Sequence, residues 1–151
     1  MSPLQSEKPA SLAIERALSD SQIRATFPLM RQLRSTLSEG EYLPRVRRMQ
    51  ASCGFALAAL SLDKEIKAVA GYRISESLAW GKFLYIDDLV SAESERSKGY
   101  GGALLRWLEE EARANGCSEL HLDSGTQRLA AHRFYLANKM DIVFFHFKKA
   151  L

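Results

Sequence analysis

A basic, glycine-rich turn in the middle of the chain is the stretch whose residues most directly predict chemistry. The strand expected before it is the apolar run Leu84-Tyr85-Ile86-Asp87-Asp88-Leu89-Val90, and a polar connector then leads to Arg96-Ser97-Lys98-Gly99-Tyr100-Gly101-Gly102-Ala103. Glycines let backbone N–H groups gather around an anion, and a following helix adds its unpaired N-terminal donors and partial positive charge. Because Arg96 and Lys98 add full charges, the turn is predicted to bind phosphate.

Two other phosphate motifs fit this turn poorly. A Walker-type loop needs Gly-Lys followed by Ser or Thr, which does not follow Gly101, and the dinucleotide fingerprint needs a third small residue where Leu104 stands. A surface turn that only caps a helix would use the same glycines without a ligand. The basic residues, the preceding strand and the following helix together favour a phosphate site.

The pattern Arg-x-x-Gly-x-Gly-Gly after a strand ending in Asp-Asp-Leu-Val resembles the acyl-CoA pyrophosphate loop of the GNAT superfamily of N-acetyltransferases. The resemblance continues from Phe83 onward: residues 122–124 are similar to the strand that follows the loop helix, and residues 130–140 to the helix that ends in a tyrosine. The N-terminal half matches only in its order of elements. Two departures stand out, because Lys139-Met140 replaces the usual Gly-Phe and Arg128 replaces an asparagine that contacts the cofactor in many members.

This resemblance implies an α/β (α+β) fold, in which helices flank a mixed, mostly antiparallel sheet with a splayed parallel strand pair at its centre. It implies an acyltransferase that moves an acetyl group from acetyl-CoA, its co-substrate, directly to a primary amine in a ternary complex. Residues 96–103 would bind the pyrophosphate, and backbone N–H groups around Leu89 and Val90 would polarise the thioester carbonyl and align the pantetheine.

Direct attack by an amine requires a base, because an amine of pKa about 10.4 is only about one part in a few thousand neutral at pH 7. Asp87 and Asp88 are the obvious carboxylates. Adjacent strand residues point to opposite faces, so at most one is expected to face the acceptor. Similarity to family members with an acid on this strand favours Asp87; a water relay and a structural role for either aspartate stay open.

Tyr135 matches the tyrosine that protonates the departing CoA thiolate in many members of the family. A phenol near 10 is a weaker acid than a thiol near 8.5, so this transfer costs about 2 kcal/mol unless the site lowers the phenol pKa. Tyr135 could also serve only as an aromatic packing residue. His121, His132 and His146 are expected to be structural, and no hydrolase triad is indicated.

Composition bounds the remaining possibilities. The 151 residues, 46% of them hydrophobic, suit one domain over 11–151 after a loose tail over 1–10. A net charge of +3 suits an anionic small ligand and is too low for a nucleic-acid surface. Cys53 and Cys117 are expected to be free thiols, with no metal site, and the lack of a signal-like or membrane-length apolar run predicts a soluble cytoplasmic protein.

The expected elements follow in an order that fits one mixed sheet. An edge strand over 11–18 leads to two helices, capped at Ser19 and by a capping box at Ser38, with Pro28 kinking or restarting the first. A hairpin over 55–75, with its turn at Asp63-Lys64, carries Gly71 as a bulge or close contact, and the strand over 84–90 pairs in parallel with the strand over 120–123 across the loop helix. A helix over 127–138 and a strand over 142–147 complete the chain.

Two other functions remain compatible with these residues: a non-catalytic acyl-CoA sensor of the same fold, and a regulator whose glycine turn binds ATP or NAD. The acceptor is expected to be a small-molecule or peptide amine, with no nucleic acid and no membrane as partner. Polyamines and protein lysines remain open as acceptors, and so does the oligomeric state, with a homodimer as one option.

Overall fold

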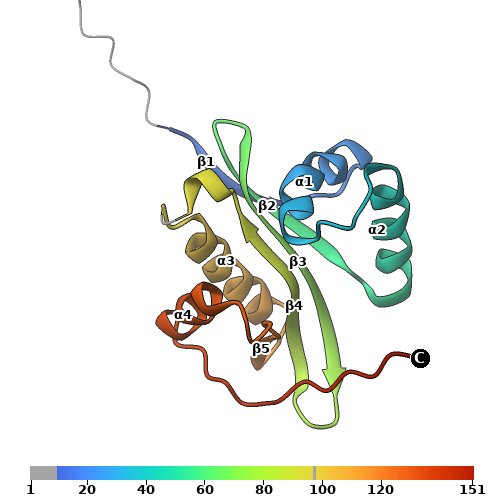
Figure 1. The fold of residues 1–151 in the computed structure, drawn as a ribbon, viewed down its shortest axis with the longest axis vertical. Helices are drawn as coiled ribbons and strands as arrows, with labels where there is room; N and C mark the ends of the chain where they lie inside the picture. Colours follow the sequence, from blue (N-terminus) through green and yellow to red (C-terminus); the bar gives the residue numbers. More distant parts are fainter. Residues whose placement is uncertain (1–9, 97) are drawn as a thin grey trace, which may run out of the picture.

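A five-stranded sheet forms the centre of the computed structural model, which describes residues 10–96 and 98–151 (Figure 1). The predicted N-terminal tail, apart from Ala10, and Ser97 lie outside the described residues. The strand order follows the sequence, and the strands are β1 (Leu12–Arg16), β2 (Ala56–Leu62), β3 (Glu65–Ser77), β4 (Gly81–Ser91) and β5 (Glu119–Leu122). β1 to β4 pair antiparallel, whereas β4 and β5 pair in parallel. The predicted fold class, including its parallel strand pair, is thereby confirmed.

Helices cover both faces of this sheet. α1 (Asp20–Leu33) and α2 (Glu39–Cys53) lie on one side of it, and α3 (Tyr100–Ala114) and α4 (Leu129–Ala137) on the other (Figure 1). A short 3-10 turn, η1 (Glu93–Glu95), connects β4 to the turn before α3. The catalytic and ligand-binding candidates lie on β4, on the connection after η1, on the first turn of α3 and on α4.

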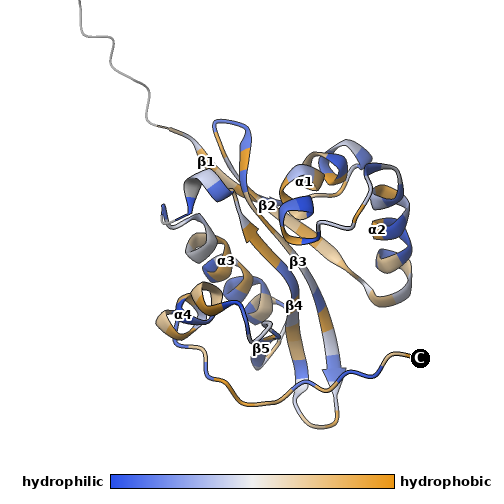
Figure 2. Cartoon of the chain, in the orientation of Figure 1, coloured by the Kyte–Doolittle hydropathy of each residue, from blue (hydrophilic) through white to orange (hydrophobic). Residues whose placement is uncertain are grey.

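Two apolar clusters hold the layers together. On the α3 side, Leu104, Leu105 and Leu108 pack against strand residues that include Leu84 and Ile86. On the other side, residues of α1 and α2 pack against a second set, Phe55, Leu57, Val69 and Val90. Figure 2 shows the matching orange, hydrophobic stretches along the middle strands. Because helices cover both faces of the sheet, the central residues of β2 and β3 are buried as continuous runs over 56–60 and 67–72.

The β2–β3 hairpin has the predicted turn at Asp63-Lys64, where both residues have positive φ angles of 50° and 68°. Gly71 was predicted to mark a bulge or a close contact, and the structure shows both. The register of the β3–β4 pairing shifts after Gly71, and a Cβ atom at this position would clash with Asp88 and Phe55. α1 has the predicted cap, in which Ser19 and Gln22 form a capping box. It runs through Pro28 as one continuous helix, so no restart occurs there.

Two local predictions are wrong. Ser38 occupies the N-cap of α2 but makes no side-chain cap hydrogen bond, so its predicted capping box does not form. Buried Tyr42 and Val46 hold that helix instead. Residues 142–147, predicted to be a strand, belong to no strand and are exposed. Within the described ranges, no helix is long and apolar enough to cross a membrane.

Candidate active site

A β-bulge in β4 sets the position of the two predicted carboxylates. Gly71 of β3 pairs with Asp88, whereas the next residue, Tyr72, pairs with Ile86, so that Asp87 is an extra residue. A bulge places two residues of one strand opposite one residue of its partner and interrupts the alternation of side chains. The side chains before and after this point therefore no longer follow a single alternating pattern.

Both carboxylates consequently face the side of the sheet that α1 and α2 cover. Arg73 binds the Asp87 carboxylate through Nε at 2.8 Å and Nη2 at 3.0 Å, and it follows Tyr72, which packs in the α3-side cluster, so Arg73 points to the other face. The Asp88 carboxylate accepts a 2.8 Å hydrogen bond from Nε of Arg34, which directly follows α1. The expectation that adjacent strand residues point to opposite faces is wrong here, because the bulge intervenes.

Arg34 fixes the bulge as well as the carboxylate. Its Nη2 donates to the backbone oxygen of Asp87 at 2.8 Å while its Nε binds Asp88. The Asp88 side chain is 13% exposed, and burial raises the pKa of this carboxyl, although Arg34 partly offsets the rise. A carboxylate with a raised pKa is a stronger base than an ordinary aspartate, which suits removal of a proton from an amine.

A cavity of about 200 Å³ opens between α1, α2 and β4, with Asp88 in its wall. Its other charged groups are Arg34 and Arg45, and its apolar wall includes Met30 and Phe55. This cavity can hold a small molecule next to a carboxylate, which is what an amine acceptor needs.

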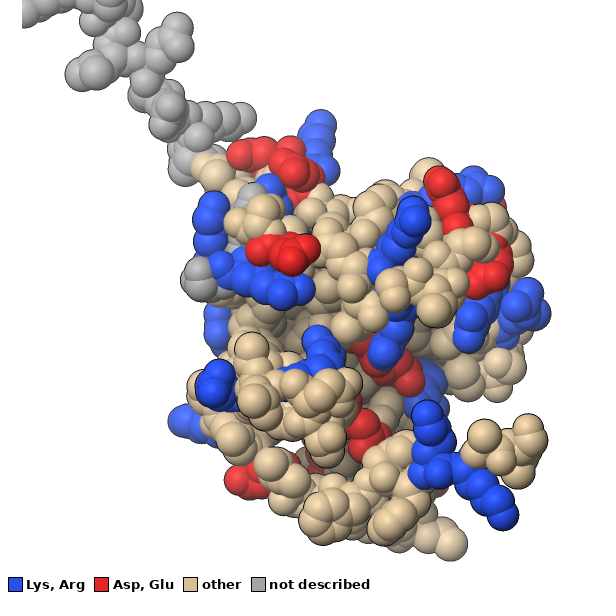
Figure 3. Space-filling model, in the orientation of Figure 1, with Lys and Arg blue, Asp and Glu red and all other residues tan. Residues whose placement is uncertain are grey.

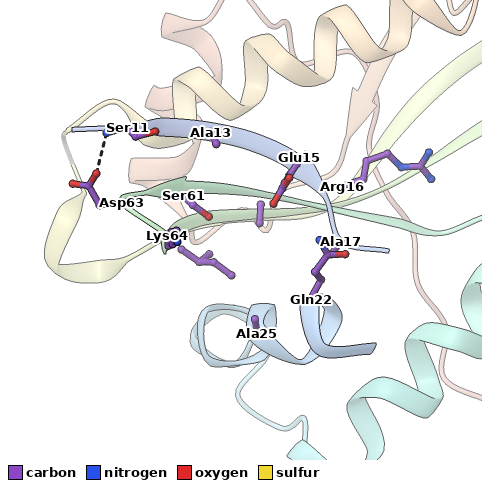
Figure 4. Close-up of a pocket in the computed structure, with 12 residues that line it drawn as sticks. Ser11, Ala13, Glu15, Arg16, Ala17, Gln22, Ala25, Ser61, Asp63 and Lys64 are labelled. Carbon is purple, nitrogen blue, oxygen red and sulfur yellow. Dashed lines mark hydrogen bonds between the residues drawn. The ribbon is translucent and has the colours of Figure 1, made fainter. Parts of the chain in front are cut away.

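A larger cavity of about 480 Å³ lies elsewhere, between β1, β2 and the first turns of α1 (Figure 4). Its lining includes Ser11, Glu15, Gln22 and Lys64, and none of the candidate catalytic or phosphate-binding residues. Gln22 already accepts hydrogen bonds from the backbone at the start of α1. Size alone therefore does not identify the site, and this larger cavity belongs to another part of the molecule.

A polar row that the sequence analysis did not single out runs from β3 to β5 beside the carboxylates. The Arg73 guanidinium, bound to Asp87, lies 5.0 Å from the centre of the Tyr85 ring, and the Tyr85 hydroxyl donates to Asp123. Burial and this hydrogen bond raise the pKa of Tyr85. His146 Nδ1 lies 3.6 Å from the same carboxylate. Sequence spacing gave no signal for this row, because its members come from four separate segments.

The glycine turn leads directly into the first turn of α3. Gly99 has a φ of 82°, a conformation that favours glycine, and its backbone oxygen accepts the 3.0 Å hydrogen bond from Ala103 N. The backbone N–H groups of residues 100–102 come before the first hydrogen bond of the helix, so they have no acceptor within it. Arg96 is exposed at the start of the turn. Backbone donors and positive charge thus converge as an anion site requires.

The parallel strand pair leaves one edge of β4 open. β5 pairs with β4 only as far as Ile86↔Leu122, whereas β4 continues to Ser91. Leu89 and Val90 lie on this continuation and pack into the clusters on opposite faces of the sheet. An extended group could therefore align along β4 beyond the end of β5, as an added strand does.

Tyr135 lies on α4, on the opposite side of the sheet from the two aspartates. α4 packs closely on the start of α3: a Cβ atom at Gly101 would lie 3.6 Å from Cζ of Phe134, whose ring contacts Tyr135. Burial raises the pKa of Tyr135, and the positive charge of Arg128 partly offsets this rise. The glycine turn and Tyr135 thus lie on the α3 side of the sheet, whereas the two carboxylates lie on the side that α1 and α2 cover.

The turn after α4 contains no glycine. Lys139 has a φ of 63°, in the left-handed region, and Met140 N donates to the backbone oxygen of Tyr135 at 3.1 Å. Met140 packs against the α3-side cluster. Lysine and methionine thus form the turn at the position where the family usually has Gly-Phe.

His121 and His132 contact neighbouring groups that are not candidate site residues. His121 stacks on Trp80 at 3.8 Å between ring centres, and His132 Nε2 contacts the backbone oxygen of Gly125 at 2.7 Å. Cys53 and Cys117 are free thiols. Over residues 10–96 and 98–151, no three His, Cys, Asp or Glu side chains group so that they could hold a metal ion.

Comparison with known proteins identifies the class of enzyme as an acyltransferase. The model of the acetyltransferase (GNAT) family matches residues 22–139, and this chain therefore belongs to that family. An uncharacterised N-acetyltransferase, YhdJ of Bacillus subtilis (strain 168), is 38% identical over 110 residues, which are 73% of this chain and 78% of that protein.

Two further similar proteins are named for an activity. An aminoalkylphosphonate N-acetyltransferase of Salmonella typhimurium (strain LT2) is 41% identical over 66 residues, 44% of this chain and 43% of that protein. The solved structure of the aminoglycoside N-acetyltransferase AAC(6')-Iy, in complex with CoA, has a TM-score of 0.77 at 15% identity, covering 95% of this chain and 99% of that one. This structural match with the aminoglycoside N-acetyltransferase shows a shared fold.

Proposed function

We propose that this enzyme transfers the acetyl group of acetyl-CoA to a primary amine of a small molecule by direct attack. The observation that carries the proposal is the open edge of β4 beyond Ile86, with carboxylates on one side of the sheet and α3 and α4 on the other. A thioester aligned along this edge would be within reach of an acceptor from one face and of Tyr135 from the other. The free thiols fit a reducing compartment, so we also propose a cytoplasmic location.

The phosphates of the co-substrate are assigned to the turn before α3. Arg96 and Lys98 supply positive charge, and the first amides of α3 supply directed donors. The proposed set is the one expected from the sequence, residues 96–103 together with the backbone of Leu89 and Val90. Ser97 is retained in this set on its sequence alone.

Asp88 is the base that the geometry favours over Asp87. Arg73 occupies both oxygens of Asp87, whereas Arg34 contacts only Oδ1 of Asp88. In the reaction, the amine nitrogen attacks the acetyl carbonyl carbon and the C–S bond breaks. The proton of the amine passes to Asp88, directly or through water, and Tyr135 gives its proton to the departing thiolate.

The cavity beside Asp88 favours a small acceptor that carries an anionic group as well as an amine. Asp88 would attract the ammonium form, and Arg34 and Arg45 would bind the anion. A volume of about 200 Å³ suits a molecule of a few heavy atoms better than a folded protein surface. The aminoalkylphosphonate substrate class named for one relative has this combination of charges.

A thermal-shift comparison of acetyl-CoA, CoA, ATP and NAD tests the co-substrate first. A ligand at about 100 times its Kd adds about 2.7 kcal/mol of stability, which means a shift of several degrees for a domain of this size. Thiol release is then measured with an aminoalkylphosphonate, a polyamine, an aminoglycoside and a peptide amine. Stabilisation by ATP or NAD alone would overturn the proposal, and CoA binding without turnover of any amine would favour the sensor function instead.

A further inference from the structure

β4 and β5 each carry an aspartate directly after the last residue pair that joins them. That pair is Ile86↔Leu122, and Asp87 and Asp123 are the next residues along the chain. The hydroxyl of Tyr85, one residue before Ile86, donates a hydrogen bond to the Asp123 carboxylate. This bond holds Asp123 against β4 at the point where the parallel pairing ends and the open edge begins.

Asp123 lies on the same side of the sheet as the carboxylates of β4. The residues on either side of Tyr85 pack in the α3-side cluster, so Tyr85 points to the other side, which α1 and α2 cover. Its ring lies 5.0 Å from the Arg73 guanidinium, which in turn binds Asp87. An amine that approaches the open edge from this side therefore meets carboxylates from both strands.

The Asp123 carboxylate is more accessible than those of β4. Its side chain is 47% exposed, whereas the side chains of Asp87 and Asp88 are 24% and 13% exposed. Tyr85 and His146 both approach Oδ2 of Asp123, and His146 Nδ1, at 3.6 Å, is too far for a hydrogen bond. Within the described part of the chain, no hydrogen bond reaches Oδ1 of Asp123. This oxygen can accept a hydrogen bond from a bound amine.

The C-terminal segment, residues 142–151, passes beside Asp123 and leaves a path from solvent. His146 and Phe144 bring the segment to β5 and to the turn before β4, through the contact with Asp123 and a distance of 5.5 Å to the Trp80 ring centre. Figure 3 shows a hollow between this segment and the rest of the molecule, with acidic side chains in it. From residue 113 to residue 151 nothing is buried. A small amine can therefore reach Asp123 through this hollow.

We propose that Asp123 holds the attacking amine from the β5 side while Asp88 removes its proton, and that Tyr85 positions Asp123 for this contact. The proposal rests on the proposed acetyl transfer and adds two residues to it. When the amine nitrogen bonds to the acetyl carbonyl carbon, the nitrogen becomes positively charged and carries two hydrogens. One proton passes to Asp88, and the other N–H donates to Oδ1 of Asp123, whose negative charge stabilises the nitrogen as its charge develops. Asp123 itself stays ionised throughout.

Asp123→Asn tests the charge, because asparagine has a similar shape and can still accept the hydrogen bond from Tyr85. The probe is the amine of the panel above that the wild type acetylates fastest, measured by thiol release. Its kcat/KM is expected to fall by about 10–100-fold, as for a lost hydrogen bond to a charged group. The KM for acetyl-CoA and the slow hydrolysis of acetyl-CoA without an amine should not change, because neither involves the amine. Glu119→Gln, a change at a 49% exposed acid of the same strand, is the matched control and should leave kcat/KM unchanged.

Tyr85→Phe tests the positioning role. Phenylalanine keeps a ring beside Arg73 and removes only the hydroxyl that binds Asp123. The expected loss in kcat/KM is about two- to tenfold in the wild-type background. In the Asp123→Asn background it should be much smaller, because Tyr85 acts through the charge of Asp123. Losses that simply multiply would overturn this role of Tyr85.

The pH–rate profile separates holding the amine from removing its proton. The acidic limb of kcat/KM should remain in Asp123→Asn, because Asp88 still takes the proton. Disappearance of that limb would make Asp123 the base and overturn the assignment. Wild-type turnover with an unchanged kcat/KM in Asp123→Asn would overturn this inference alone. A wild type that acetylates no amine of the panel would overturn the proposed function, and this inference with it.

Discussion

Gly71 of β3 leaves the space that the Asp88 carboxylate occupies. The two residues are paired across the β3–β4 ladder, and a Cβ atom at position 71 would lie 2.5 Å from Oδ2 of Asp88 and 2.6 Å from Cζ of Phe55. The glycine thus lets a buried carboxylate lie against the strand next to the bulge, within reach of Arg34.

Gly71→Ala is expected to destabilise the protein and displace the carboxylate. Phe55 is buried and Asp88 is tied to Arg34, so neither can move freely away from a new methyl group. Overpacking of this kind costs about 2 kcal/mol, which lowers the Tm of a domain of this size by about 4–8 °C. Gly40→Ala is the control for thermal melts, because it has open space in α2 and should raise the Tm slightly. Equal melting of wild type and Gly71→Ala would contradict the packing described.

Asp88→Asn is expected to lower turnover strongly, by about 10²–10⁴-fold if Asp88 is the base. The same substitution should stabilise the fold near neutral pH, because burial raises the pKa of Asp88 in the folded state. The folded protein therefore binds this proton more tightly than the unfolded chain, so the charged carboxylate costs stability that grows as the pH rises from the ordinary value of 3.8 through the raised one.

The pH dependence of that variant provides the check. The Tm of Asp88→Asn minus that of the wild type should be more positive at pH 7 than at pH 4, because asparagine carries no charge to desolvate. Loss of the bond to half-exposed Arg34 lowers the free energy of unfolding of the variant by only about 0–1 kcal/mol. Asp141→Asn, at an exposed aspartate, should show no such difference. A difference of the opposite sign would mean that the Arg34 pair outweighs burial.

Tyr135→Phe is expected to lower turnover by about 10–10³-fold while the Kd for CoA changes little. The substitution keeps the ring contact with Phe134 and removes only the hydroxyl. Tyr72→Phe is the control on the same side of the sheet, because the Tyr72 hydroxyl is buried without a hydrogen-bond partner in the described chain. Its removal should leave turnover unchanged and stabilise the fold by about 1 kcal/mol. An unchanged rate in Tyr135→Phe would leave that tyrosine a packing role.

Arg96→Ala is expected to weaken CoA binding about three- to tenfold at low salt, and less at high salt, because an exposed charge near phosphate is screened. Arg113→Ala removes one charge from the other end of α3, about 20 Å away at 1.5 Å per residue, and should leave the affinity unchanged. Isothermal titration at two salt concentrations measures both. Equal losses in the two variants would indicate a general charge effect rather than a phosphate site.

Sequence patterns predicted the order of the elements because each pattern depends on neighbouring residues. The apolar runs on either side of Asp63-Lys64 predicted the hairpin, the cluster at Ser19 predicted the start of α1, and Gly71 predicted a bulge or a close contact. The parallel pairing of β4 with β5 followed from the single helix between them.

The details of the site depend on contacts that no local pattern contains. The bulge was predicted at Gly71, but its consequence, that Asp87 and Asp88 share one side of the sheet, requires knowing where the extra residue falls in β4. Arg34 and Arg73 are distant in sequence from the carboxylates they bind. Residues 142–147 have the composition of a strand, yet a strand also requires a hydrogen-bonding neighbour, which the described chain does not supply.

The distribution of buried residues has a consequence for how the protein forms during synthesis. Every buried residue of the described chain lies at or before Ala112, so the hydrophobic interior can assemble while the last part of the chain is still inside or near the ribosome. The segment that carries Tyr135 is then added to a scaffold that is already folded. Limited proteolysis should therefore cut first between Arg113 and Leu151, and acetyl-CoA should slow that cleavage. The segment made after Ala112 would thus complete the acyl site.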